Sequence, residues 1–233
     1  MTAPVSRSAH ETVLRHIEDE LAAGRVRLGE RLPGERALSQ SLGVGRSSVR
    51  EALRVLEAMG VVRRGVGSGP EAGAVVVAEP SAALSAILRL HLATSHLPIS
   101  DIVEYRLLLE SWAVRQAAGR AGSDQVAAAR ALLDAMDEPT LEPEAFHRLD
   151  AEFHVALAAM AGNVLVAGVM AALREAIHGY VMQAVSNLPD WADTARRLRA
   201  EHRGVLEAVA AGSGELAAAR VTEHIDGFYR TTL

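Results

Sequence analysis

Apolar residues along the first eighty positions recur with a spacing that predicts three short helices and two strands. The first helix is expected over residues 9–23, where four apolar residues share one face and Gly24 ends the pattern: Val13, Leu14, Ile17 and Leu21. The same spacing predicts helices over 35–42 and 47–59, then strands over 61–64 and 74–78 around a Gly-rich turn. This order is typical of a winged helix-turn-helix.

The rest of the chain is Ala-rich with a helical period and has no β-branched alternation. Pro and Gly residues divide it into segments expected at 81–95, 100–120, 123–136, 143–161, 163–186, 190–211 and 213–230. We therefore expect a mainly α protein with two domains. Residues 1–78 form a winged helix-turn-helix with a β-hairpin wing, and residues 79–233 form an all-α antiparallel bundle.

The amino-acid composition excludes or disfavours several classes of function. Of 233 residues, 49% are hydrophobic, which is ample for a packed core, but only 3% are aromatic, which disfavours single-strand binding by base stacking. The absence of Cys excludes disulfides, thiolate zinc sites and cysteine nucleophiles. No signal segment and no apolar run of about 18 residues is present, so we expect a cytoplasmic protein with no membrane partner.

The net charge of −5 conceals an uneven distribution. Residues 25–64 carry 9 Arg against 4 acidic residues, whereas residues 79–233 carry 13 Arg against 20 acidic residues. The positive charge is therefore concentrated on the predicted helix-turn-helix, where a DNA partner would require it.

The third helix separates apolar from basic residues. Val49, Ala52, Leu53 and Leu56 share one side, while Ser47, Arg50 and Arg54 lie on the other and Arg46 stands at the N-terminal edge. Arg on such an outer face can bind guanine O6 and N7 bidentately or clamp phosphate, and Arg36 at the start of the preceding helix is placed for phosphate. The alternative is a solvated face on which Arg50 and Arg54 pair with Glu51 and Glu57.

The segment PGERALSQSLGVGRSSVREALRVLEAMGVVRR resembles the N-terminal domain of GntR-family transcription regulators. The matching positions are Pro33, Glu35, Arg36, Leu38, Ser39, Gly43, Val44, Arg46, Val49, Arg50, Glu51, Ala52, Leu53, Leu56 and Gly60. The resemblance implies a double-stranded DNA operator contacted by Arg36, Arg46 and Arg50, with Ser47 beside them and Gly65 at the wing tip. The Gly65–Gly73 turn is longer than is usual in the family, and its Glu71 would repel phosphate.

Four residues of the second domain could converge on a metal ion. Asp150 and His154 are one helical turn apart, and His202 and His224 lie in two later helices. Three imidazoles and a carboxylate suit Zn²⁺, Ni²⁺ or Mn²⁺, although scattered histidines are usually hydrogen-bonded or exposed.

The segments DIVEYRLLLESWAVRQAA, LDAEFHVALAAMAGN, EHRGVLEAVAAG and EHI resemble the FCD ligand-binding domain of the FadR subfamily of these regulators. That resemblance implies a divalent metal, Zn²⁺ above all, held by Asp150, His154, His202 and His224. It also implies that Arg106 pairs with the carboxylate of an effector. The alternative for Arg106 is a surface ion pair with Glu110. His147 is one turn from Asp150 and could be an outer or spare ligand, but a solvated position is expected.

We therefore expect a regulator rather than an enzyme: a homodimeric repressor that binds a palindromic operator and is released by a small carboxylate or hydroxy-acid. A long-chain acyl effector that needs no metal is one alternative. A metal-dependent hydrolase built on the Asp/His₃ site is another, but no residue is clearly placed as its general base.

Overall fold

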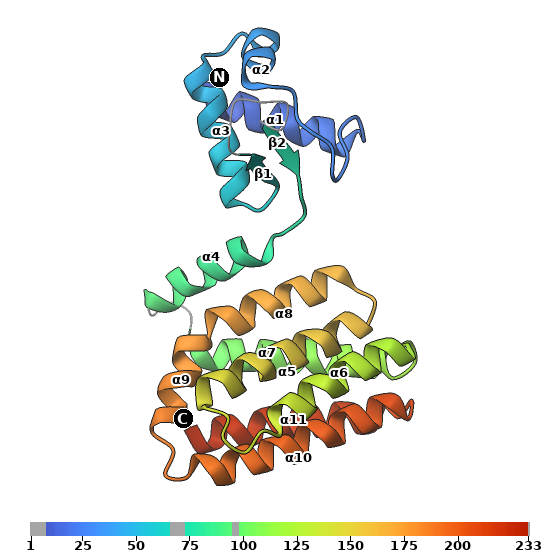
Figure 1. The fold of residues 1–233 in the computed structure, drawn as a ribbon. Helices are drawn as coiled ribbons and strands as arrows, with labels where there is room; N and C mark the ends of the chain where they lie inside the picture. Colours follow the sequence, from blue (N-terminus) through green and yellow to red (C-terminus); the bar gives the residue numbers. More distant parts are fainter. Residues whose placement is uncertain (1–7, 66–72, 95–97, 233) are drawn as a thin grey trace, which may run out of the picture. The chain divides into compact units, whose positions relative to one another are not determined.

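The computed structural model describes residues 8–65, 73–94 and 98–232 (Figure 1). The chain divides into two compact units, with the boundary between Ala83 and Leu84. The first residues of the helix that follows the linker thus group with the N-terminal unit. The described part is mainly α, as the apolar spacing predicts.

The N-terminal unit is a winged helix-turn-helix. Its elements are α1 (Ala9–Ala22), α2 (Glu35–Leu42), α3 (Arg46–Ala58), β1 (Val62–Gly65) and β2 (Gly73–Val76). Helix α3 packs against α1 and α2, and one apolar core joins all three helices to the hairpin. Val13, Val49 and Ala52 lie at the centre of this core with no exposed surface.

Local hydrogen bonds fix the turn between α2 and α3. Gly43 ends α2 with a φ of 65°, a left-handed conformation that glycine adopts without steric cost. The Ser39 hydroxyl donates to the Val44 carbonyl at 2.7 Å, and the Val44 amide donates back to the Ser39 carbonyl at 3.2 Å. The turn therefore holds the start of α3 in place without relying on distant contacts.

The wing contains a pairing that the sequence pattern does not indicate. β1 and β2 are antiparallel, with Val62 opposite Val76 and Gly65 opposite Gly73. The segment before α2 also joins the wing: its Leu32 amide donates to the Ala74 carbonyl at 2.8 Å, beside an isolated bridge between Arg31 and Val75. Residues 30–32 carry no apolar alternation, so only the pairing with β2 reveals their extended conformation.

The C-terminal unit is a helical bundle. Its helices are α4 (Ser81–Ala93), α5 (Ile99–Ala117), α6 (Ser123–Met136), α7 (Pro143–Met160), α8 (Val164–Ala176), α9 (His178–Ser186), α10 (Trp191–Ala210) and α11 (Gly214–Thr232). Helices α5 and α7 lie between α8 on one side and α10 and α11 on the other (Figure 1). Among the described residues no single helix has the length and apolar composition to cross a membrane, and only the bent pair α8–α9 meets those criteria jointly.

The expectation of one helix over residues 163–186 is wrong. The structure has two helices there, α8 and α9, bent by 46° around Ile177. Ile177 has no exposed surface and packs in one cluster with Ile102, Leu173 and Val181. The stretch is apolar on both sides of the bend and has no proline, and Gly179 lies within the first turn of α9 rather than at the bend itself.

Gly60 provides a test of packing in the N-terminal unit, because both its backbone conformation and the space around it require a glycine. Its φ is +69°, and a Cβ added to it would overlap the carbonyl of Glu79. Gly24 has nearly the same φ, +68°, with no atom within 4 Å of an added Cβ. We expect Gly24→Ala to cost about 1 kcal/mol of unfolding free energy and Gly60→Ala more than about 2 kcal/mol. Calorimetric unfolding of the two variants measures the difference, and equal losses would contradict the steric argument.

Candidate functional site

Helix α3 presents its basic face to solvent. Val49, Ala52, Leu53 and Leu56 are buried against the rest of the N-terminal unit. Arg46, Ser47 and Arg50 are exposed on the other side, and Arg36 is exposed in the first turn of α2. The structure therefore leaves the four predicted DNA-reading side chains accessible, on elements fixed by the core beneath them.

Ion pairs on this face are long and open to solvent. Arg50 Nε is 4.0 Å from Glu35 Oε2, and Arg54 Nη1 is 3.9 Å from Glu51 Oε2. Glu57 pairs not with Arg50 or Arg54 but with Arg64 of β1, at 2.7 Å. Exposed pairs of this kind contribute little stability, so they do not compete strongly with a phosphate or a guanine for the guanidinium groups.

The predicted DNA contact of the wing involves residues that are only partly described. Gly65 is exposed at the end of β1, where it pairs with Gly73. Pro70 and Glu71, on which the expected weakness of the wing contact depends, lie outside the described residues.

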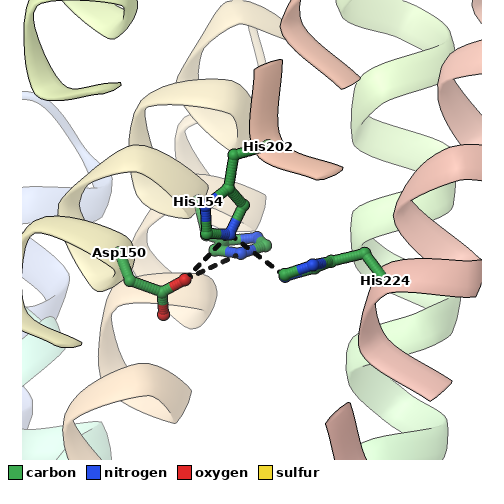
Figure 2. A group of neighbouring side chains, drawn as sticks. All are labelled: Asp150, His154, His202 and His224. Carbon is green, nitrogen blue, oxygen red and sulfur yellow. Dashed lines mark hydrogen bonds and ion pairs between the residues drawn. The ribbon is translucent and has the colours of Figure 1, made fainter. Parts of the chain in front are cut away.

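Four buried side chains from three helices converge inside the C-terminal unit (Figure 2). They are Asp150 and His154 of α7, His202 of α10 and His224 of α11. One ligand atom from each lies within 4.8 Å of the others. His202 Nε2 is 3.0 Å from Asp150 Oδ1 and 3.1 Å from His224 Nε2, and His154 Nε2 is 3.5 Å from Asp150 Oδ1.

Outer carboxylates orient two of these imidazoles. His154 Nδ1 donates to Glu110 Oε2, and His224 Nδ1 donates to Glu201 Oε2 at 2.8 Å. Donation from Nδ1 leaves the lone pair on Nε2, the nitrogen that faces the cluster. His154 Nε2 is buried and has no hydrogen-bond partner among the described residues. A carboxylate behind a histidine is the arrangement that commonly supports a metal ligand.

Burial keeps His202 and His224 in the neutral form, which is the form that binds metals. It lowers the pKa of His224 to about 3, assisted by the neighbouring His202, and it lowers the pKa of His202 well below the ordinary range. Both rings are therefore neutral near pH 7, so neither needs to lose a proton before it can bind a metal. The donor set fits a divalent metal, and this cluster could hold one.

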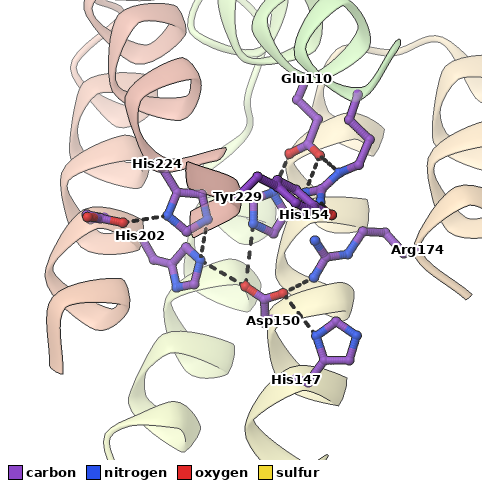
Figure 3. Close-up of polar contacts among 10 residues, drawn as sticks. Glu110, His147, Asp150, His154, Arg174, His202, His224 and Tyr229 are labelled. Carbon is purple, nitrogen blue, oxygen red and sulfur yellow. Dashed lines mark hydrogen bonds and ion pairs between the residues drawn. The ribbon is translucent and has the colours of Figure 1, made fainter. Parts of the chain in front are cut away.

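Two further side chains approach Asp150 from the other side (Figure 3). Arg174 of α8 forms an ion pair with Asp150 Oδ2, and His147 Nδ1 is 3.6 Å from the same oxygen. Burial, followed by the charge of Arg106, lowers the pKa of Arg174 to about 9. The sequence analysis missed Arg174, although a single cation within the apolar stretch 164–186 is a signal of a buried charge.

The expectation that His147 is solvated is wrong. The residue is only 5% exposed, and its ring stacks on that of His178 in α9, with the centroids 5.1 Å apart. Burial lowers the pKa of His147 to about 2, and its Nε2 has no hydrogen-bond partner among the described residues. The bend at Ile177 brings α9 against α7, which periodicity could not foresee.

Arg106 forms the ion pair that was expected as the alternative to effector binding, but not at the surface. It does pair with Glu110, with 2.9 Å between Nε and Oε1, but both residues are buried rather than on the surface. Its Nη1 donates to Tyr229 Oη at 2.9 Å. Burial raises the pKa of Glu110 by itself, but the charges of His154 and Arg106 outweigh burial and hold it well below its usual range.

A small cavity of about 30 Å³ adjoins these groups. Aromatic and aliphatic side chains form part of its wall, and its polar lining comes from Arg106, His147, Asp150, Arg174, His224 and Tyr229. The structure thus places Arg106 beside the four-residue cluster, inside the bundle.

Comparison with known proteins assigns a family model to each of the two units. Residues 9–71 match the family model of bacterial regulatory proteins of the gntR family, and residues 101–227 match the FCD domain. The chain belongs to the GntR family of transcription regulators. The FCD match is consistent with the FadR subfamily, and confirms the resemblance read from the sequence.

This GntR-family regulator matches other transcription regulators over much of their length. The HTH-type transcriptional regulator RmpR of Mycobacterium gastri is 30% identical over 222 residues, which cover 92% of this chain and 77% of RmpR. The HTH-type transcriptional repressor NanR of Salmonella newport is 32% identical over 185 residues, covering 77% of this chain and 67% of NanR. These relatives are transcription regulators and not enzymes.

A solved structure supports the fold. Streptococcus agalactiae GntR superposes with a TM-score of 0.67 at 24% identity, covering 96% of this chain and 99% of that protein. The winged helix-turn-helix and the helical C-terminal unit therefore follow a known architecture.

The buried ion pair of Arg106 and Glu110 yields a stability test. Both residues are 3% exposed, and the pair is 2.8 Å long; Arg196 and Asp193 form a pair of the same length at 73% and 68% exposure. Arg106→Leu removes the arginine partner of a buried carboxylate, so we expect a loss of about 3 kcal/mol, against less than about 1 kcal/mol for Arg196→Leu. Urea unfolding measures both, and similar losses would refute a structural role for the buried pair.

Proposed function

We propose that this GntR-family regulator is a repressor of a palindromic operator, released by a small carboxylate or hydroxy-acid bound beside a divalent metal. One observation carries the DNA-binding part: α3 buries its apolar face in the core and leaves Arg46 and Arg50 exposed. Residues 1–78 would read DNA, and residues 79–233 would bind the effector and dimerise. The repressor assignment is supported by the relative named as one.

The exposed basic residues would contact different parts of the DNA. Arg46, Ser47 and Arg50, at the start of α3, are placed to reach base edges in the major groove, where Arg binds guanine bidentately. Arg36, in the first turn of α2, is placed for phosphate, because a helix N-terminus itself favours an anion. The Gly65 backbone at the end of β1 would follow the adjacent DNA surface.

DNA recognition is tested by Arg46→Ala and Arg50→Ala. Each removes one bidentate base contact, so we expect specific binding to weaken at least about tenfold, with an unchanged circular dichroism spectrum. The probe is DNA selected from random sequence by the unaltered protein, and mobility shifts are measured at fixed salt.

The control is Arg25→Ala, which removes an equal charge from an arginine paired with Glu20 outside α2 and α3. Undiminished binding by both α3 variants, or an equal loss in Arg25→Ala, would overturn the assignment of α3 as the reading helix.

In the C-terminal unit, Asp150, His154, His202 and His224 would hold the metal. Three imidazoles and one carboxylate favour Zn²⁺, with Ni²⁺ and Mn²⁺ as alternatives. Such a metal would supply positive charge and open coordination positions for an anionic ligand. Glu110 and Glu201 would hold two of the imidazoles in the binding orientation.

Arg106 and Arg174 would bind the effector's carboxylate. Asp150 is paired with Arg174, and a carboxylate committed to a metal would leave that guanidinium free to bind another anion. Arg106 lines the same cavity and keeps its charge through Glu110. Two buried arginines favour a small anion over a long acyl chain, which remains the alternative effector.

The pairing of the charged groups that line the cavity links effector binding to movement. Asp150 and Arg174 are already paired with each other, so an organic acid that binds there must displace such side chains from their present partners. A ligand that prefers the displaced arrangement would shift the population of conformations, and so the operator affinity.

Metal binding is tested with zinc and the full chain. We expect one Zn²⁺ per chain by elemental analysis, and an unfolding temperature that zinc raises and a chelator lowers, because a ligand of the folded state stabilises it. His154→Ala should lose both responses. His16→Ala, which removes a histidine from α1, should retain them.

A panel of small carboxylates with and without zinc extends this measurement. A carboxylate that stabilises the protein only with zinc supports the proposed effector site. Zinc binding by His154→Ala at full strength, or stabilisation by a long-chain acyl compound regardless of chelator, would refute it.

A further inference from the structure

A groove that is open to solvent lies on the surface of the C-terminal unit, where α8 and the start of α9 face α7. Part of its lining is small and apolar and comes from Ala151, Val155, Ala156, Ala159 and Ala171. The charged residues at its rim are exposed: Glu144, Arg148, Glu152 and Glu175. His147, Arg174 and His178 complete the lining.

Two residues belong to both this groove and the buried cavity. Among the described residues, His147 of α7 and Arg174 of α8 are the two that line both spaces. They are 5% and 4% exposed, so they are almost completely covered. Figure 3 shows them on the side of Asp150 that faces away from His202. These two side chains therefore form the wall between the cavity and the open groove.

Hydrogen bonds hold this wall in place only in part. His147 Nε2 and Arg174 Nε are buried and have no hydrogen-bond partner among the described residues. His147 Nδ1 is 3.6 Å from Asp150 Oδ2, which is longer than a hydrogen bond. A buried polar atom without a partner gains hydrogen bonds when it meets water. Turning these side chains toward the groove therefore recovers part of the free energy that the movement costs.

The ring that supports His147 also faces the groove. His178 is the first residue of α9, directly after the 46° bend at Ile177, and its ring stacks on that of His147 with 5.1 Å between the centroids. His178 is only partly buried and lines the groove. Its ring has open space beside it, and when it turns away, His147 loses a stacking partner.

Large aromatic rings close the remaining thin part of the cavity wall. Trp191 and Phe228 are the other partly exposed residues of the cavity lining. The Trp191 ring meets that of Phe146 edge-on with 5.2 Å between the centroids, and Phe228 meets Tyr229 in the same way at 5.4 Å. Opening the wall there would expose apolar rings to water, whereas opening it at His147 and Arg174 exposes polar groups that water can solvate.

We propose that the groove between α7 and α8 is the entrance to the effector cavity, with His147 and Arg174 as a gate that His178 holds closed. The proposal rests on the proposed function, because it requires a cavity that receives an organic anion. A carboxylate that enters meets Arg174 at the end of the groove and can replace Asp150 as the partner of its guanidinium. The mostly acidic rim favours ligands with one carboxylate over ligands with several.

The accessibility of a thiol in the cavity tests the entrance. The chain has no Cys, so Leu198→Cys introduces a single thiol. Leu198 is a 5% exposed residue of the cavity wall on α10, a helix that contributes nothing to the groove. Iodoacetate, a small carboxylate that alkylates thiols, is added to the full chain, and the modification is followed by mass spectrometry. Because the thiol is buried, its rate of modification reports how often the wall opens.

Filling the groove should close the entrance. Ala151 lines the groove one helical turn after His147, so Ala151→Trp should slow the modification of Leu198→Cys at least about tenfold. Ala171→Trp fills the same groove from α8 and should act alike, which keeps the test decisive if one variant does not fold. The matched control is Ala131→Trp, in a second surface groove that shares no lining residue with the cavity, and it should leave the rate unchanged.

Removing the support of the gate should have the opposite effect. His178→Ala deletes the ring on which His147 stacks, so the thiol should react about two- to tenfold faster. A rate that His178→Ala does not raise would overturn the role of His178 in the gate.

Equal rates with and without tryptophan in the groove would overturn the entrance, and so would a thiol that iodoacetate does not reach below the unfolding temperature. The modification requires neither metal nor effector, so its outcome is separate from that of the proposed function. A failed metal site would appear as a lack of bound zinc with the expected rates of modification. A failed entrance would leave the zinc content and its loss in His154→Ala as proposed.

Discussion

The carboxylate of Asp150 is the constraint around which the C-terminal unit is organised. It lies inside the bundle, where a lone negative charge would be strongly destabilising, and Arg174 and three imidazoles surround it. These partners come from four sites on α7, α8, α10 and α11. The helices must therefore keep their register for the charge to stay compensated. Any cation or anion that enters must replace some of the contacts that Asp150 now makes.

A second charged group, Arg106 with Glu110, extends this network toward α5. Glu110 joins the arginine to His154, and Tyr229 of α11 closes the other side of the guanidinium. The apolar cluster that contains Phe153 and Leu206 packs beside these groups, with the Phe153 and His154 rings 5.7 Å apart. Polar networks of this kind are costly unless every member is satisfied, and here His154 Nε2 remains unsatisfied at the point where a metal would bind.

The N-terminal unit solves a different problem with simpler means. Its core needs only small and aliphatic side chains, and the turn at Gly43 is held by Ser39 and Val44. All charge is left at the surface, where Arg46 and Arg50 can meet DNA. The N-terminal unit thus carries the exposed basic face on an apolar core. The C-terminal bundle carries the buried charges, which can respond to a ligand.

The sequence by itself determined the elements and the family, because these depend on residues close together in the chain. The period of Val49, Leu53 and Leu56 fixes which face of α3 is buried, and the glycines that end helices are visible as letters. The four residues of the cluster could be named in advance as a possibility, but only the resemblance to a family favoured them over other histidines, since positions as far apart as Asp150 and His224 share no local signal. Their convergence within 4.8 Å is a property of the packed helices.

Only the tertiary structure decided the rest. The bend at Ile177, the burial of His147 beneath α9 and the ion pair of Arg174 with Asp150 all depend on contacts between distant helices. An apolar helix has the same periodicity whether it is straight or bent, and a histidine has the same letter whether it is solvated or buried. The environment of a polar side chain is set by what packs against it, which the local pattern does not record.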